Sequence, residues 1–315
     1  MSLRISTAPH AHNPITTQRL MLFVVIALLP TAAAGVYAFG IPALTVLMVS
    51  CATAVLSELV WQLIAKQEIR IDDYSALVTG LILGLNLPST APWWMAMIGS
   101  AFAVLIVKQL FGGLGDNFLN PALAARAVLL ASWPKYMTAS AYVSPTFFQS
   151  GVDAVTAATP LAQKDGFSLM QLFLGQCPGT IGEVCKAAIL LGLLFLLITG
   201  TVSWRIPVVM TGSVFVFTWL LGGVSAEAAL AATLSGGVLF GAVFMATDYV
   251  TSPITPRGQI LYAAGIGLII VLIRLFNSTY PEGVTYGILL MNIATPLIDR
   301  IPRKIYGYQK EGKKA

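Results

Sequence analysis

Long apolar runs alternate with short polar segments along almost the whole chain. Several of these runs approach the roughly 20 residues that an α-helix needs to cross the hydrocarbon core of a bilayer. The pattern therefore predicts about ten transmembrane helices. Their expected ranges are 20–40, 42–64, 75–88, 93–111, 119–132, 184–203, 206–222, 228–247, 258–276 and 283–298.

Two of the expected spans, 75–88 and 119–132, are short for a full crossing and carry glycine or proline at their edges. In transporters and channels, short interrupted helices line a central site, because their freed backbone groups need protein or water as partners. The alternative is that both are ordinary tilted spans. The pattern leaves both interpretations open.

The composition excludes a soluble domain. Hydrophobic residues make up 57% of the 315 positions and charged residues only 10%, whereas a typical soluble domain has roughly 25% charged residues. So few charges cannot cover a water-facing surface, and the expected surroundings are the lipid bilayer. Basic loops explain the net charge of +5, and because no basic stripe with interleaved aromatic residues is present, no nucleic-acid partner is expected.

The distribution of basic residues predicts the orientation. The tail after Asp299 carries six Lys or Arg residues, and cytoplasmic loops of membrane proteins are enriched in both. With an even number of spans, both termini are expected in the cytoplasm. The first apolar run is too long for a signal peptide, so no cleaved leader is expected. The chain then divides into an N-terminal arm with a first set of spans (1–132), an extracytoplasmic connection (133–183), a second set of spans (184–299) and a basic cytoplasmic tail (300–315).

Few side chains could hold a metal ion. Cys51 lies in an apolar run and is expected to be a packing residue. Cys177 and Cys185 fall on the external side, where a disulfide can persist, but the sequence does not decide whether they pair. No Cys-x-x-Cys or Cys/His cluster is present, so no iron–sulfur cluster with ligands from this chain is expected. His10 and His12 lie in the polar arm and are expected to be solvated, so we predict no metal site.

Segments 76–130 and 237–297 resemble each other in layout. "LVTGLILGLNLPST" leads into one apolar run, and "LFGAVFMATDYVTSPITP" leads into another. If five spans separate the copies, the second is inverted relative to the first, a common transporter plan with its site at the repeat interface. The alternative is chance, because apolar segments of low complexity imitate one another.

Polar side chains at membrane depth are costly, so clusters of them indicate function. The first cluster, 108–127, has three glycines that allow close backbone approach, followed by Asn117, Asn120 and Arg126. The structural alternative is a glycine turn in which Asn120 caps a helix with Pro121 at its first position. That alternative does not account for Arg126.

The second cluster, 244–258, places Thr247 and Asp248 at the end of a span, followed by further hydroxyl groups. If the repeats are inverted, Thr247 and Asp248 converge with Asn117, Asn120 and Arg126 near the middle of the fold, where a neutral flavin ring could accept their hydrogen bonds. The alternative is helix capping by the asparagines and an interfacial position for Asp248.

The third cluster, 151–163, lies in the external connection. Asp153 is followed by Thr156 and Thr159, with only alanine between the two threonines. Small neighbours leave the Thr159 hydroxyl open to another protein. On physical grounds alone the segment is an ordinary loop.

Four segments together carry a resemblance to a known family: "DYSALVTGLILGLNLP", "PWWMAMIGSAFAVLIVKQLFGGLGDNFLNPALAARA", "DAVTAATPLA" and "FMATDYVTSP". They occur in the family's order, and the similarity runs from near Pro14 to beyond Asp299. The chain resembles the D subunits of Rnf electron-transport complexes. Their sister family comprises the B subunits of sodium-pumping NADH:quinone reductases.

The resemblance implies a covalent flavin. In that family a flavin transferase joins FMN through its phosphate to a threonine that follows an acidic residue and a second hydroxyl. Asp153, Thr156 and Thr159 match this motif, which makes Thr159 the acceptor; Ala157 replaces a frequent glycine. The later "GEVC" matches a family segment near the flavin at Glu183, whereas Val184 and Cys185 depart from it.

The resemblance also implies the fold and the partners. The fold would be all-α, with two inverted five-helix repeats as in urea transporters. The chain would be a subunit of a bacterial inner-membrane complex that couples electron flow between ferredoxin and NAD to Na⁺ or H⁺ movement. Other Rnf subunits, including the extracytoplasmic FMN-bearing G subunit, would be partners, and a second, non-covalent flavin such as riboflavin would lie among the helices. No catalytic residue is expected, because a flavin supplies its own redox chemistry.

Three alternatives compete with this function. A channel or secondary transporter of the same fold would carry no covalent flavin. A structural scaffold would bind redox partners without a redox centre of its own. Neither requires an exposed threonine at the spacing of Asp153, Thr156 and Thr159. The closest alternative is a B-type subunit of the sister quinone reductase; "FMATDYVTSP" and the short N-terminal arm favour the Rnf family over it.

Overall fold

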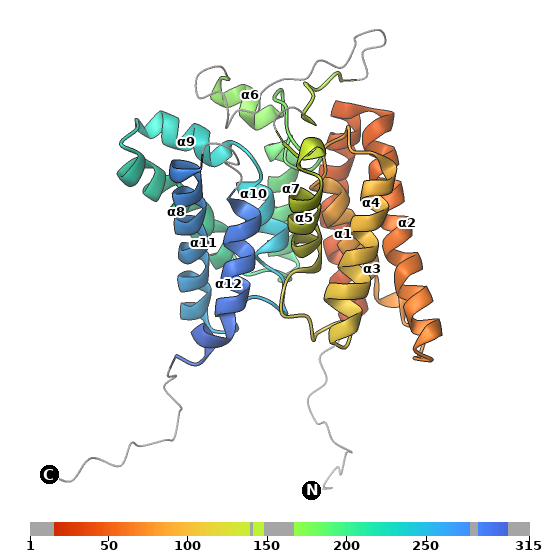
Figure 1. Ribbon diagram of the computed structural model, residues 1–315. Coiled ribbons are helices and arrows are strands. Elements are labelled where there is room, and N and C mark those ends of the chain that lie inside the picture. The colour runs from red at the N-terminus through yellow and green to blue at the C-terminus, as the bar shows by residue number, and fades with distance from the viewer. Residues whose placement is uncertain (1–15, 139–140, 148–166, 278–282, 302–315) are drawn as a thin grey trace, which may run out of the picture.

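The computed structural model describes residues 16–138, 141–147, 167–277 and 283–301, and helices dominate these ranges. Figure 1 shows the helices standing side by side, with the shorter α6 and α9 near one end of the molecule. The helices are α1 (Thr17–Phe39), α2 (Ile41–Ile64), α3 (Ser75–Leu85), α4 (Trp93–Phe102), α5 (Pro121–Ser132), α6 (Leu169–Leu174), α7 (Lys186–Ile198), α8 (Arg205–Gly222), α9 (Ala226–Leu234), α10 (Val238–Phe240), α11 (Pro256–Phe276) and α12 (Val284–Asp299).

Two helices continue into wider π-helical turns. α4 runs on through Ala103–Lys108, and α10 runs on through Gly241–Met245. Such turns are rare and occur often at functional sites. Both of them end next to the pocket described below.

Five helices in the described ranges are long and apolar enough to cross a membrane, and a sixth span results if α9 and Val238–Met245 form one crossing bent by 64°. Apolar side chains exposed on the outside, such as Ile64, Ile198 and Leu220, suit contact with lipid. The prediction of an all-helical, multi-pass membrane protein is confirmed. Four of the expected spans are shorter helices, namely α3, α5, α7 and α12.

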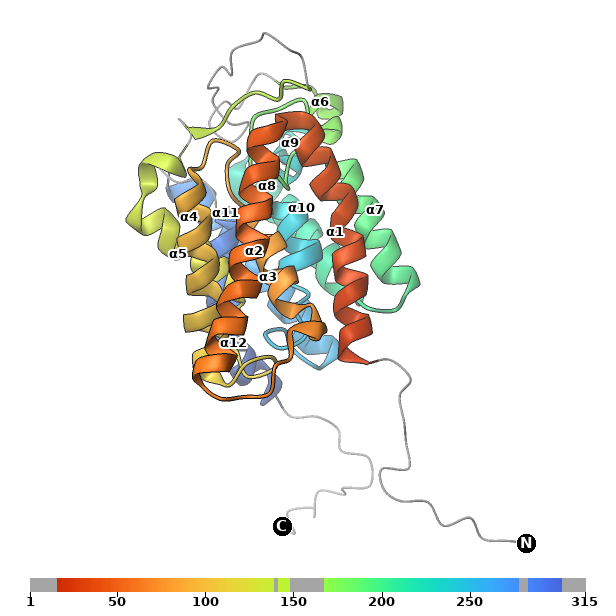
Figure 2. The ribbon, with the colours of Figure 1, turned by 90° about the vertical axis from the view of Figure 1, so that its right-hand side faces the viewer.

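The two ends of the described chain lie on one face. α1 begins and α12 ends at the bottom of Figure 1, whereas α6 lies at the top. The view in Figure 2 shows α1 and α2 in front, with α7 beside α1. The described flanks of the segment 148–166 are therefore on the opposite face from the two ends of the helical body.

Close packing relies on small residues, as is usual between membrane helices. α2 packs on α3 and α4, where the Ser50 hydroxyl donates to the Gly80 carbonyl at 2.7 Å. A Cβ on Gly80 would lie 2.8 Å from the Cα of Cys51, so only glycine fits there. In the other half, α8 packs on α11, and α11 packs on α12. Between the halves, α3 packs on α5, and Asn86 and Asn120 at their ends contact Met245 at the end of the bent span.

Candidate functional site

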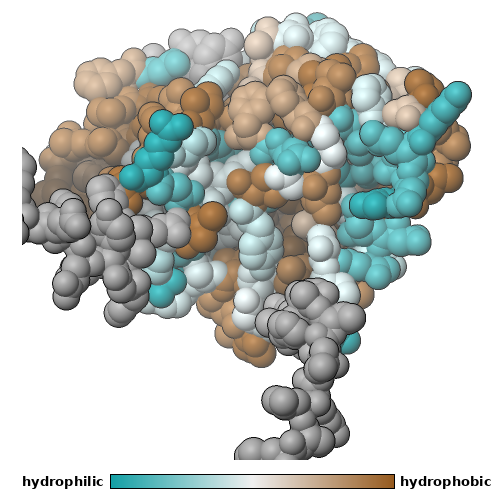
Figure 3. All heavy atoms as spheres, turned by 90° about the horizontal axis from the view of Figure 1, so that it is seen from below, coloured by the Kyte–Doolittle hydropathy of each residue, from teal (hydrophilic) through white to brown (hydrophobic). Residues whose placement is uncertain are grey.

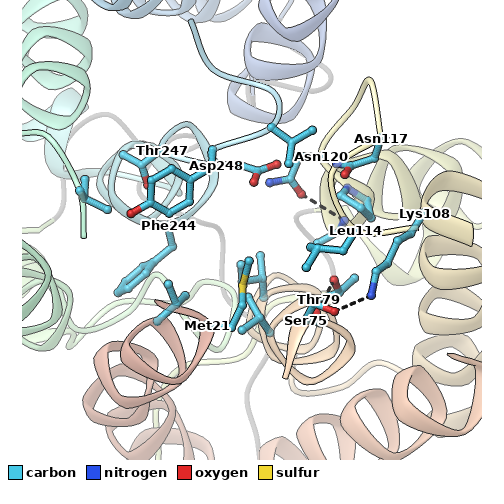
Figure 4. A pocket seen from close by; sticks show the side chains of 18 of the residues that line it. Met21, Ser75, Thr79, Lys108, Leu114, Asn117, Asn120, Phe244, Thr247 and Asp248 are labelled. Atoms are coloured by element: carbon cyan, nitrogen blue, oxygen red, sulfur yellow. Dashed lines mark hydrogen bonds between the residues drawn. The ribbon is translucent and has the colours of Figure 1, made fainter. Parts of the chain in front are cut away.

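A pocket lies between the two halves of the chain, in the lower part of the molecule. Residues of α1, α3, α5, α7 and the segment after the second π-turn line it. One wall is apolar and includes Met21 and Phe244, and the opposite wall carries most of the polar groups (Figure 4). The cavity volume is about 90 Å³. The structure therefore places a small amphipathic cavity where the interrupted helices meet.

Four of the residues expected from the sequence line this one pocket: Asn117 and Asn120 from the first cluster, and Thr247 and Asp248 from the second. The two clusters are more than 100 positions apart in the chain, and Figure 4 shows their side chains around the same space. The structure thus brings these four of the five expected residues together around one space, whereas Arg126 is not among the lining residues.

Asn120 joins the two halves directly. Its side-chain oxygen accepts from the Ala122 N–H at 3.1 Å and the Leu123 N–H at 3.3 Å, so it caps α5 as its position before Pro121 suggests. Its side-chain nitrogen donates to the Met245 carbonyl, 3.3 Å away, at the end of the second π-turn. Asn120 therefore both caps α5 and lines the pocket.

Asp248 lies beyond the end of the bent span. The Thr251 hydroxyl donates to its Oδ2 at 3.1 Å. Burial raises the pKa of the Asp248 carboxyl, and the hydrogen bonds from Thr251 and from the backbone amides of Val250 and Tyr249 counteract this rise. The Thr247 hydroxyl is occupied by the Val243 carbonyl at 2.6 Å. Asp248 is the acidic group of the pocket.

A buried ion pair borders the pocket on the side opposite Asp248, and sequence reasoning missed it. The Lys108 ammonium donates to Glu58 Oε1 at 2.7 Å and to the Ser75 hydroxyl at 2.6 Å. Gln109 donates to the same Glu58 oxygen at 2.7 Å. Lys108 and Glu58 are each only 2% exposed. The available signal was a glutamate and a lysine inside two apolar runs, where an ionisable residue calls for a partner.

Arg126 does not line the pocket. Its guanidinium donates to Asn86 Oδ1 at 3.1 Å, and Asn86 in turn donates to the Ile82 carbonyl at 2.7 Å and approaches the Met245 sulfur at 3.9 Å. Arg126 is buried, with 3% exposure. It supports the end of α3 behind the pocket and makes no direct approach to the cavity.

Glu183 lies in a buried turn beside the end of α3. The turn enters the core because the Ile181 and Gly182 amides donate to the carbonyls of Leu87 and Leu85, at 3.2 and 2.7 Å. Glu183 Oε1 accepts from the Thr180 N–H at 3.0 Å. This carboxylate is built into the core. Asp153, Thr156 and Thr159 lie outside the described residues.

Within the described ranges, the structure shows neither a disulfide nor a cluster of metal-ligating side chains. Cys51, Cys177 and Cys185 are all free thiols. The described part of the chain contains no group of three or more His, Cys, Asp or Glu side chains that could hold a metal ion. His10 and His12 lie outside the described residues.

The fold and the pocket define a class, namely polytopic helical membrane proteins with a polar site between two sets of helices. Comparison with known sequences gives the family. Residues 4–307 match the model of the NQR2, RnfD, RnfE family, and the chain therefore belongs to this family. The resemblance seen in the sequence motifs is confirmed.

Similar proteins cover the whole chain. The D subunit of the Na(+)-translocating ferredoxin:NAD(+) oxidoreductase complex of Acetobacterium woodii is 47% identical, over 100% of this chain and 98% of the relative. The D subunit of the proton-translocating ferredoxin:NAD(+) oxidoreductase complex of Clostridium ljungdahlii is 42% identical, over 96% of this chain and 95% of the relative. The D subunit of the ion-translocating oxidoreductase complex of Salmonella arizonae is 36% identical, over 98% and 100%.

Proposed function

We propose that this chain is the D subunit of an ion-translocating ferredoxin:NAD oxidoreductase complex and carries flavin in two places. The observation that carries the proposal is a similarity to such subunits over the whole chain, at up to 47% identity. The complex couples electron flow between ferredoxin and NAD to ion movement, and this chain forms only part of its active machinery. Because the relatives are named for Na⁺ or for protons, the transported ion is Na⁺ or H⁺.

The first flavin is FMN, bound covalently through its phosphate to Thr159 by a flavin transferase. The support is the spacing of Asp153, Thr156 and Thr159 with only alanine before the acceptor. A tethered flavin stays in place during turnover, and when bound it supplies one- and two-electron chemistry that side chains lack. The test is ultraviolet fluorescence of the chain in a denaturing gel, after expression together with the transferase.

The second flavin is non-covalent, such as riboflavin, and its place is the pocket between the two halves. Asn117, Asn120, Thr247 and Asp248 place amide, hydroxyl and carboxyl groups on one side of the cavity, which Ser75, Thr79 and Lys108 also line. Such a donor set suits the polar edge of a flavin ring, and the apolar wall with Phe244 suits its faces. These residues would bind and orient the ring and exclude water from it.

The pocket is too small, as it stands, to hold a flavin ring. Its volume of about 90 Å³ is below that of the engineered cavity of about 150 Å³ that holds benzene. A flavin ring therefore enters only when a wall opens. The wall that includes Leu114 and Asn117 belongs to a loop in which Gly112, Gly113 and Gly115 all have positive φ, and we propose that this loop moves.

Removing the polar groups of the pocket is expected to reduce its flavin content. In the Thr159→Ala protein, any flavin released by denaturation is non-covalent, so this protein is the reference. Adding Asn120→Ala and Asp248→Ala removes two pocket groups and should reduce the released riboflavin or FMN several-fold, since each lost hydrogen bond costs about 1 kcal/mol. Equal release with and without the two changes, or release from neither protein, would count against the pocket as a flavin site.

We further propose ten crossings arranged as two inverted repeats, like those of urea transporters, with boundaries near 132 and 184. In support, α1 and α7 pack side by side, and α1 runs upward where α7 runs downward (Figures 1 and 2). α5 also packs on α12. Corresponding helices thus meet across the centre, as an inverted pair of repeats requires.

In the bacterial inner membrane, the face at the bottom of Figure 1 would be cytoplasmic. Hydrophilic side chains gather on that face (Figure 3), and basic residues enriched at one face mark the cytoplasm. Thr159 would then lie outside, within reach of the flavin transferase and the FMN-bearing G subunit. The basic residues at the helix ends of this face are Arg19, Lys66, Arg70, Arg205, Arg257 and Arg300.

The orientation predicts which positions an impermeant thiol reagent reaches. In intact spheroplasts, a cysteine placed at Thr159 should be labelled, and a cysteine placed at Lys313 should be labelled only after the membrane is opened. The reason is that the reagent meets only the external face. The reverse pattern would overturn both the orientation and the assignment of Thr159 to an external transferase.

The small volume of the pocket favours one other function, a channel or transporter of this family without a redox centre. In that case the chain would show neither fluorescence in the gel nor released flavin. A B-type subunit of a sodium-pumping quinone reductase is the other candidate. A purified complex that oxidises ferredoxin would support the D-subunit proposal, and one that reduces quinone would support the B-type subunit.

A further inference from the structure

The bent span is broken directly above the pocket. α9 ends at Leu234, α10 begins at Val238, and the two parts meet at 64°. Gly236 in the break has a φ of +67°, which other residues rarely adopt. The lower part, Val238–Met245, ends with the Met245 carbonyl that Asn120 binds. The direction of this lower part therefore sets where the pocket residues that follow it lie.

A cation holds the upper side of the break. From α11, the Arg274 guanidinium donates to the Ala232 carbonyl at 2.6 Å and to the Ser235 carbonyl at 3.0 Å. Carbonyls at the end of a helix have no partners within the helix and carry the negative end of its dipole. The fork of an arginine side chain can meet two of them at once.

An anion lies on the lower side of the break. Glu183 is buried, with 5% exposure, and a Cβ built on Gly237 would lie 3.3 Å from its Oε2. Gly237 precedes the first residue of α10, so the Glu183 carboxylate lies beside the start of the lower part of the bent span. The turn that carries Glu183 is itself fixed, because its residue Gly182 packs against Leu85 and Phe240, where a Cβ would clash.

We propose that Arg274 and Glu183 are positioning residues for the pocket. Their opposite charges, one on each side of the break, fix the angle of Val238–Met245 and thereby the places of the Met245 carbonyl, Thr247 and Asp248. Glu183 then acts on the pocket from within the core. Only the riboflavin measurement below rests on the proposed function; the positioning itself does not.

Riboflavin binding measures the consequence for the ligand. With the purified full-length Thr159→Ala chain, quenching of flavin fluorescence gives the dissociation constant. Arg274→Leu and Glu183→Gln should each raise it about tenfold, as expected for the loss of one charge-assisted interaction. Arg274→Lys keeps a charged donor for the same carbonyls and should bring the constant back to within about threefold of the parent. A residue that only stabilises the fold would give no such rescue.

A second measurement does not involve flavin. A cysteine placed at Thr247 is labelled in inside-out vesicles, and its rate is compared with that of a cysteine placed at Gln18, on the same face but outside the bent span. Arg274→Leu and Glu183→Gln should change the rate at position 247 at least about threefold, an effect of the order expected from a modest shift in local opening, and leave the rate at position 18 unchanged.

The outcomes separate the two proposals. A changed rate at position 247 without riboflavin binding in any variant, the parent included, supports the positioning role and counts against the second flavin. Unchanged riboflavin affinity and an unchanged rate at position 247 in folded Arg274→Leu and Glu183→Gln proteins would overturn the positioning role. If Arg274→Leu does not fold, Glu183→Gln decides by the same criterion.

Discussion

Replacing Thr159 by alanine is expected to remove the covalent flavin from the chain completely while leaving the protein inserted in the membrane. The acceptor hydroxyl is the only atom through which the phosphate of FMN would be attached, so its loss leaves no bond to form. Ultraviolet fluorescence of the chain in a denaturing gel, after expression with the flavin transferase, measures the result. Because denaturation removes any flavin in the pocket, the band reports the covalent one alone.

Two matched variants show whether the effect is specific. Thr156→Ala removes the other hydroxyl of the motif and should weaken the band without abolishing it. Thr146→Ala removes a hydroxyl from the same connection (133–183), outside the motif, and should leave the band at the level of the parent. A Thr159→Ala chain that still fluoresces would show that the flavin is attached elsewhere or that the motif has another role.

The sequence predicted more of the pocket than of its surroundings. Asn120 followed by Pro121 indicated a helix start, and the structure shows that cap. The sequence also grouped Asn120 with Asp248, because polar residues at the ends of apolar runs are exceptions with few explanations. The hydrogen bond from the Asn120 side chain to the Met245 carbonyl could not be foreseen, because it joins residues 125 positions apart and depends on the angle of the bent span.

Three features were beyond sequence reasoning for physical reasons. The break at Gly236 reads as one continuous apolar run, because hydropathy does not register a bend. The π-turns that end at Lys108 and Met245 have no composition of their own. Arg126 was grouped with the pocket because charge at membrane depth indicates function, but its partner Asn86 places it behind the cavity. Sequence patterns thus identified which groups are unusual, and packing decided which way each one faces.

Among the changes proposed here, breaking the buried ion pair of Lys108 and Glu58 is expected to lower the stability of the folded chain most. Lys108→Met keeps most of the side-chain volume but removes the charge, so that Glu58 keeps a single bond from Gln109 to its Oε1. Glu58 Oε2 is already buried without a hydrogen-bond partner. Breaking a buried pair by removing one partner costs about 3–5 kcal/mol, because an uncompensated charge stays in the interior.

The measurement is the unfolding midpoint of the purified full-length chain in detergent, followed by heat and by a denaturing detergent. Lys108→Met should lower both midpoints strongly. The double variant Lys108→Met, Glu58→Gln removes both charges, leaves an amide oxygen that Gln109 can still bind, and should recover most of the loss. Arg70→Met is the matched control, because the ion pair between Arg70 and Glu68 is exposed at the surface and such pairs contribute little. Equal midpoints for Lys108→Met and Arg70→Met would show that the charge of Lys108 is not what holds α2, α3 and α4 together beside the pocket.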